Sequence, residues 1–177
     1  MLKREKLEGI VNKLFNEFMD FWGKYKYQNE VIYTILEMLV DRLYNKILNY
    51  IKYYERGVYK LANFEIYNCI EDLILIGQGF VYLLSDNGEF KDEKMAEDIV
   101  ETLIKKNIDY GDSFEKVLLK TTDSNMVARL YDKLFRLQHL CKNKALINES
   151  SYDTIKDGIG YTILCINYLN GKIGEIK

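Results

Sequence analysis

Apolar residues recur at intervals of three and four along most of the chain, which is the spacing of one face of an α-helix. Residues 6–21 show the pattern clearly, with Leu7, Val11 and Leu14 on the apolar face. Equivalent patterns predict six helices, over residues 6–21, 29–55, 64–84, 91–106, 124–141 and 149–169. We therefore expect an all-α fold, a helical bundle of about six helices.

Glycine residues and polar stretches separate the predicted helices. The strongest turn signal is Asp86-Asn87-Gly88, close to the midpoint of the chain. Asn148 or Ser150 is expected to cap the last helix, since both side chains accept hydrogen bonds from free backbone N–H groups. The 177 residues include no proline, so no residue of that kind breaks a long helix.

The two halves of the chain share three short blocks of sequence in the same order and at nearly the same offset. The blocks are residues 8–11 with 97–100, 42–46 with 129–133, and 67–72 with 152–157. We interpret the chain as an internally duplicated three-helix unit. Residues 1–88 form a degenerate N-terminal repeat and residues 89–177 form the second repeat, both sharing one core. Chance similarity between amphipathic helices of biased composition is the alternative.

The composition excludes several classes of protein. Hydrophobic residues make up 48% and aromatic residues 14%, which argues against global disorder. The 25 basic and 27 acidic residues give a net charge of −2, so a dedicated binder of duplex DNA is not expected. No stretch approaches about 18 uncharged apolar residues, and the N-terminal residues carry mixed charge. We expect a cytoplasmic protein without a membrane span.

Carboxylates gather on one face of the last predicted helix. Glu149, Asp153 and Asp157 are spaced four residues apart, so they lie one turn from each other. Like charges at this spacing repel, and a divalent cation such as Mg²⁺ would offset the repulsion by taking oxygen ligands. Asp132 on a neighbouring helix could complete the set. The alternative is a solvated acidic face with lysine and arginine nearby.

A second polar stripe lies on the helix predicted over residues 124–141. Arg129, Asp132, Lys133 and Arg136 recur at helical spacing on this stripe. Arginine and lysine in such an arrangement bind phosphate groups, arginine through two parallel hydrogen bonds. The alternative is a set of ion pairs within the helix. The chain has no glycine-rich nucleotide motif of the P-loop or Rossmann type.

Three segments together resemble a known family. Residues 105–114 (KKNIDYGDSF), 129–137 (RLYDKLFRL) and 149–161 (ESSYDTIKDGIGY) are similar to the nucleotide modification associated domain, type one. This small all-α family occurs largely in phages and prophages, and the likeness covers about residues 95–168. Its carboxylate layout is similar to that of the MazG-like and dimeric dUTPase-like all-α nucleotide pyrophosphohydrolases, which bind Mg²⁺ through carboxylates on neighbouring helices.

The resemblance implies a function in phage nucleotide metabolism, with a nucleotide as ligand and a homodimer as a candidate assembly. Mg²⁺, or Mn²⁺ in its place, would be held by the residues that also act in catalysis: Asp132, Glu149, Asp153 and Asp157. The implied substrate contacts are Lys106, Asp109, Tyr110, Asp112, Arg129, Lys133 and Arg136. Tyr110 or Phe114 would stack on the base, or simply pack.

Three functions follow as hypotheses. The first is a Mg²⁺-dependent pyrophosphohydrolase-like protein acting on a (deoxy)nucleoside triphosphate. The second is a non-catalytic nucleotide-binding module, which regulates a modification enzyme or sequesters a nucleotide signal as a phage counter-defence. The absence of an E-x-x-E pair on the segment 129–137 favours this second hypothesis. The third is a helical adaptor without a ligand.

Overall fold

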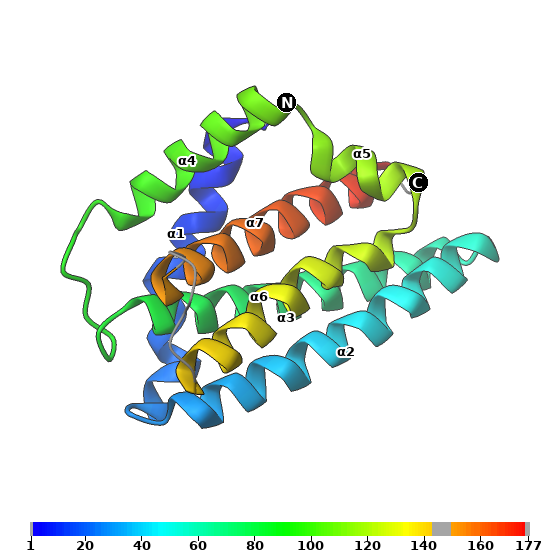
Figure 1. The fold of residues 1–177 in the computed structure, drawn as a ribbon. Coiled ribbons are helices and arrows are strands. Elements are labelled where there is room, and N and C mark those ends of the chain that lie inside the picture. Colours follow the sequence, from blue (N-terminus) through cyan, green and yellow to red (C-terminus); the bar gives the residue numbers. More distant parts are fainter. Residues whose placement is uncertain (1, 143–149, 176–177) are drawn as a thin grey trace.

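The computed structural model describes residues 2–142 and 150–175, and these ranges hold seven α-helices and two short 3₁₀-helices (Figure 1). In chain order the elements are α1 (Arg4–Trp22), η1 (Gly23–Tyr25), α2 (Asn29–Glu55), α3 (Tyr59–Leu84), α4 (Met95–Tyr110), α5 (Ser113–Lys120), η2 (Asp123–Asn125), α6 (Met126–Lys142) and α7 (Ser151–Glu175). The prediction of an all-α bundle of about six helices is confirmed. The additional helix is α5, which the sequence pattern did not predict.

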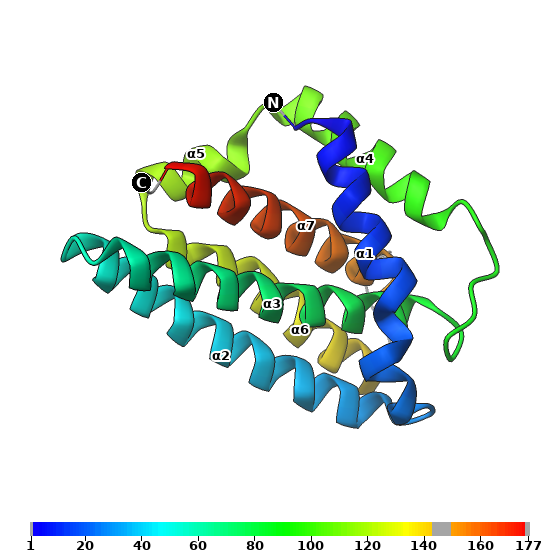
Figure 2. The same cartoon turned by 180° about the vertical axis from the view of Figure 1, so that it is seen from behind.

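Four long helices, α2, α3, α6 and α7, run alongside one another and form the body of the bundle (Figure 1). α2 packs against α3 and α6, and α7 packs against the same two helices. α1 crosses the bundle steeply and contacts α3 and α7, as the view from behind shows (Figure 2). α4 lies against α1 and α7, so it closes the side of the bundle opposite to α2.

The helices related by the three shared sequence blocks contact one another in pairs. α1 contacts α4, α2 contacts α6, and α3 contacts α7. α5 lies between α4 and α6, where the first half of the chain has only η1. The internal duplication stays a prediction, because helices of a compact bundle contact several neighbours in any case.

α3 is a strongly apolar helix at the centre of the core, and glycine allows its close packing. A Cβ atom at Gly79 would lie 2.6 Å from a methyl group of Leu36 and 2.8 Å from the indole ring of Trp22. Trp22 is fully buried, and its indole N–H donates to the backbone carbonyl of Leu75 at 2.9 Å. No helix in the part of the chain that the structure describes is long and apolar enough to cross a membrane.

The start of α7 is defined by a side-chain cap. The Ser150 hydroxyl accepts a hydrogen bond from the backbone N–H of Asp153 at 3.1 Å, and it donates to the Asp153 carboxylate at 2.8 Å. Ser150 therefore caps this helix, which confirms one of the two residues predicted for the cap. The other predicted residue, Asn148, lies outside the described residues. The helix runs on to Glu175, six residues beyond its predicted end.

Candidate functional site

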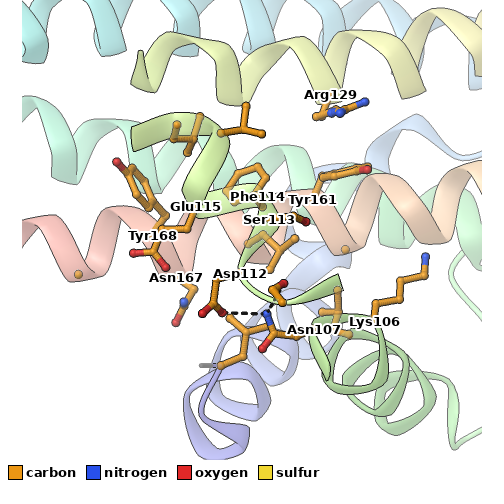
Figure 3. Close-up of a pocket in the computed structure, with 18 of the residues that line it drawn as sticks. Lys106, Asn107, Asp112, Ser113, Phe114, Glu115, Arg129, Tyr161, Asn167 and Tyr168 are labelled. Atoms are coloured by element: carbon orange, nitrogen blue, oxygen red, sulfur yellow. Dashed lines mark hydrogen bonds between the residues drawn. The ribbon is translucent and has the colours of Figure 1, made fainter. Parts of the chain in front are cut away.

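A cavity of about 900 Å³ opens between α1, α4, α5 and α7, with a side chain of α6 at its edge (Figure 3). Ligand pockets for small molecules span roughly 300 to 1,000 Å³, so this cavity can hold a molecule the size of a nucleotide. The apolar part of its lining includes Leu103, Leu118 and Leu164. The remaining lining is rich in charged, amide and aromatic side chains, which is the composition of a pocket for a polar ligand.

The turn between α4 and α5 builds one wall of this pocket. The Asn107 side-chain amide donates to the backbone carbonyl of Gly111 at 3.2 Å and to the Asp112 carboxylate at 3.0 Å. The hydrogen bond from Asn107 lowers the pKa of Asp112 below its ordinary value. Gly111 has a φ of +60°, a conformation that glycine adopts without strain. The turn directs Phe114 and Glu115 of α5 toward the cavity (Figure 3).

Arg129 of α6 and Lys106 of α4 lie on the same side of the pocket, beside Tyr161 of α7 (Figure 3). The guanidinium carbon of Arg129 is 5.9 Å from the centroid of the Tyr161 ring, within the range of a cation–π contact. Among the described residues, no carboxylate lies within ion-pair distance of Arg129. Its guanidinium group is thus available to an anionic ligand.

Asp157 is the counter-ion of two lysines from different helices. The Lys106 ammonium is 3.1 Å from one carboxylate oxygen, and the Lys133 ammonium is 3.3 Å from the other. The Lys133 side chain is only 10% exposed, so its charge needs a partner inside the protein. Both oxygens of Asp157 are therefore engaged by ammonium groups.

The first half of the chain contains a similar ion cluster, and we call it the closed cluster because its aspartate is buried. Asp72 of α3 is buried and accepts two hydrogen bonds from Arg42, at 3.1 Å and 2.6 Å. The ammonium of Lys46 lies 2.9 Å from the same carboxylate. Arg42 and Lys46 stand one helical turn apart on α2, so both contact the same aspartate.

The shared sequence blocks align this closed cluster with the pocket. They place Asp72 opposite Asp157, and Arg42 opposite Arg129. Arg42 is bound to its aspartate, whereas Arg129 is not, because Lys106 of α4 occupies the equivalent place beside Asp157. The same arginine position is thus structural in the first half of the chain and faces a cavity in the second.

The predicted metal ligands that the structure describes, Asp132, Asp153 and Asp157, do not gather into a metal-binding cluster. Asp132 is exposed, 3.7 Å from the ammonium of Lys133 next to it, and Asp153 belongs to the cap at Ser150. No group of three or more His, Cys, Asp or Glu side chains is placed to hold a metal ion in residues 2–142 and 150–175. The described carboxylates by themselves therefore form no three-carboxylate site of the predicted kind. Glu149 lies outside the described residues, and the metal site stays a prediction.

The structure brings some of the predicted ligand contacts together and leaves others outside the cavity. The predicted residues that line it are Lys106, Asp112, Arg129, Asp153 and Asp157. Those that lie outside its lining are Asp109, Asp132, Lys133 and Arg136. Lys133 does not line the pocket itself, but its ammonium group forms an ion pair with the lining residue Asp157. Tyr110 ends α4, but its side chain lies outside the described part of the structure.

The sequence patterns did not predict several of the residues that line the pocket. Tyr161 stands four residues after Asp157, so the helical spacing already seen in α7 could have identified it. Glu115 and Asn167 carried no comparable signal. Two of the aromatic rings that line the pocket, Phe114 and Tyr161, lie with their centroids 6.4 Å apart and their planes tilted by 40°.

Comparison with known proteins found no relative of this chain. No protein-family model matches the chain, and neither a curated protein nor a solved structure matches it. By its fold and its cavity, the protein is an all-α helical bundle with a charged pocket between α1, α4, α5 and α7.

Proposed function

We propose that the protein is a non-catalytic nucleotide-binding module and that the pocket between α1, α4, α5 and α7 holds the nucleotide. The observation that carries the proposal is the position of Arg129. Its counterpart Arg42 is bound to a buried aspartate, while Arg129 faces the pocket without a carboxylate partner in the described residues. A guanidinium group in this situation suits a phosphate group, because its planar fork pairs with two oxygens at once.

The charge balance beside Arg129 supports an anionic ligand. The cations Lys106, Arg129 and Lys133 meet two carboxylates, those of Asp157 and Asp132, and both carboxylates contact a lysine. One positive charge therefore remains in excess among these groups, that of Arg129, and a nucleotide phosphate would neutralise it. The rings of Phe114 and Tyr161 offer an apolar surface for the ribose or the base.

The arrangement of the carboxylates favours binding over hydrolysis. Pyrophosphohydrolysis by the predicted mechanism needs carboxylates that are free to bind Mg²⁺. Asp157 is held by Lys106 and Lys133, and Asp153 is engaged by Ser150 at the helix N-terminus. We therefore place the binding module before the hydrolase as the proposed function.

Thermal unfolding with a panel of nucleoside mono- and triphosphates tests the proposal. A ligand that binds only the folded state must stabilise it, by about 2.7 kcal/mol at a concentration of 100 times Kd. We expect Arg129→Gln to weaken nucleotide binding about 10- to 100-fold, because the variant loses a charge-assisted hydrogen bond to the phosphate. The control is Arg56→Gln, an exposed arginine at the α2–α3 turn that is not among the lining residues, which should leave the affinity unchanged.

Two outcomes would count against the proposal. If no nucleotide stabilises the wild-type protein, the pocket is not a nucleotide site. If Arg129→Gln and Arg56→Gln bind nucleotides equally well, the site lies elsewhere. Incubation of the wild-type protein with triphosphates and Mg²⁺ provides a separate test of catalysis. Recovery of intact triphosphate supports the binding module, whereas release of pyrophosphate supports the hydrolase.

A further inference from the structure

The first half of α3 carries a line of exposed side chains on its outer face. Lys60, Phe64, Tyr67 and Glu71 recur at intervals of three and four residues, so they follow one another along the same side of the helix. Phe64 is 60% exposed and Tyr67 56% exposed, and the neighbouring Leu61 is 45% exposed. We call the first four residues the outer stripe of α3. Adjacent exposed apolar side chains bordered by charged ones are typical of a surface that binds another protein.

No other described helix covers this part of α3. α1 crosses α3 in its second half, where the indole N–H of Trp22 donates to the carbonyl of Leu75. Gln78 continues the line of the outer stripe by two further turns and is only 4% exposed. In the view from behind, α1 lies over the end of α3, and no helix lies over its beginning (Figure 2). The outer stripe is therefore accessible to a second molecule.

The sequence of the outer stripe is complementary to its own reverse. It runs from a cation, Lys60, through two aromatic residues to an anion, Glu71. If a second copy of α3 packs against it in the antiparallel direction, Lys60 of each copy faces Glu71 of the other. Among the described residues, neither Lys60 nor Glu71 forms an ion pair within its own chain. Both charges are therefore available to a second copy.

We infer that the protein forms a two-fold symmetric dimer in which the outer stripes of α3 pack against each other in antiparallel orientation. Phe64 and Tyr67 of both copies form the apolar centre of this interface, and the ion pairs between Lys60 and Glu71 lie at its two ends. A parallel arrangement sets like charges against each other and is disfavoured. No residue of the outer stripe lines the pocket, so this inference does not rest on the proposed nucleotide site.

Sedimentation equilibrium of the full chain, from about 1 to about 500 µM, tests the inference. Two short helix faces bury less area than a standard interface, so we expect a Kd of the order of 10 µM. Phe64→Glu should raise this Kd by more than about 10-fold, because it places a charge at the apolar centre. Met38→Glu is the matched control, because Met38 is 65% exposed on α2, outside the outer stripe, and should leave the Kd unchanged. Fluorescence of the single Trp22 verifies that each variant is folded.

Reversing the charges tests the antiparallel orientation. Lys60→Glu sets a glutamate opposite Glu71 at both ends of the interface, so it should raise the Kd about 10-fold, and Glu71→Lys should do the same. The double variant restores opposite charges and should return the Kd to within about 3-fold of the wild type. Reversal is used because neutralising one partner of an exposed ion pair changes little.

Three results would each overturn the inference. If the wild-type protein is monomeric at the highest concentration, the outer stripe faces solvent or a different partner. If Phe64→Glu dimerises as tightly as Met38→Glu, the interface lies on another surface. If the double charge reversal is no tighter than the two single variants, Lys60 and Glu71 do not face each other and the antiparallel arrangement is wrong.

Discussion

The ammonium group of Lys46 lies 2.9 Å from the carboxylate of Asp72, a side chain that is 2% exposed. The contact has a counterpart in the second half of the chain, where Lys133 lies 3.3 Å from Asp157. The two aspartates differ in their surroundings. Asp72 is enclosed between α2 and α3, whereas Asp157 lines the pocket and is 31% exposed. The first contact therefore holds the bundle together, and the second forms part of the candidate site.

Replacing Asp72 should destabilise the protein. We expect Asp72→Asn to lower the free energy of unfolding by about 2 kcal/mol, because Arg42 and Lys46 lose their shared counter-ion. The loss stays moderate because the Arg42 side chain is 52% exposed and can be hydrated. Urea denaturation followed by Trp22 fluorescence measures the change. The neighbouring, exposed Glu71 provides the control: Glu71→Gln should stay within about 0.5 kcal/mol of the wild type. Equal stability of the two variants would contradict a structural role for the ion pair.

Two glycines should respond in opposite directions to the same substitution. Gly79→Ala places a methyl group 2.6 Å from Leu36 and 2.8 Å from the Trp22 ring, both fully buried. Overpacking of this kind costs about 1 to 3 kcal/mol, which exceeds the gain of about 1 kcal/mol from replacing a helical glycine. Gly9 lies on the exposed face of α1 with nothing within 4 Å of an added Cβ atom, so Gly9→Ala should stabilise the protein. Thermal unfolding of both variants tests the pair, and a shift in the same direction would be inconsistent with close packing at Gly79.

Alkaline pH should destabilise the protein through Tyr168. Burial, together with the hydrogen bond to Asp123, raises the pKa of Tyr168 in the folded state above its ordinary value of about 10. The folded state thus holds this proton more tightly than the unfolded state does. The contribution to stability is complete below about pH 10 and is lost as the pH rises beyond it, at up to about 1.4 kcal/mol per pH unit.

The measurement is the urea midpoint between about pH 8 and pH 11, on either side of the ordinary tyrosine pKa. Lysines also titrate in this range, so the comparison between variants carries the test. Tyr168→Phe should show a shallower decline than the wild type. Tyr27→Phe alters a tyrosine that is 76% exposed and should follow the wild-type curve. If all three proteins decline in parallel, Tyr168 does not contribute to the alkaline loss of stability.

The helices were predictable from the sequence because each one buries a continuous apolar face. Leu7, Val11 and Leu14 are all buried, as their spacing in the first predicted helix requires. The cap at Ser150 was equally predictable, because it depends on residues only three positions apart. α5 escaped prediction because it has only eight residues, fewer than the window over which helical periodicity can be recognised.

The pocket depends on relationships that no local pattern contains. Glu149, Asp153 and Asp157 are spaced four residues apart, and this spacing indicated a polar site on one face of the last predicted helix before the tertiary structure was considered. The spacing did not reveal that Lys106 of α4 and Lys133 of α6 would neutralise Asp157. The spacing also gave no indication of α5, which forms one wall of the cavity.

The sequence by itself determined that this chain forms amphipathic helices and which faces they bury, and it placed the helices over residues 6–21, 29–55 and 124–141 to within two residues at both ends. These properties follow from hydrogen bonds and side-chain spacing within a few residues along the chain. Only the tertiary structure decided which charges pair. Lys106 and Asp157 are 51 residues apart, and their contact depends on how α4 and α7 pack. That packing engages the oxygens of Asp157 and leaves Arg129 facing the pocket, so it decides what the site can bind.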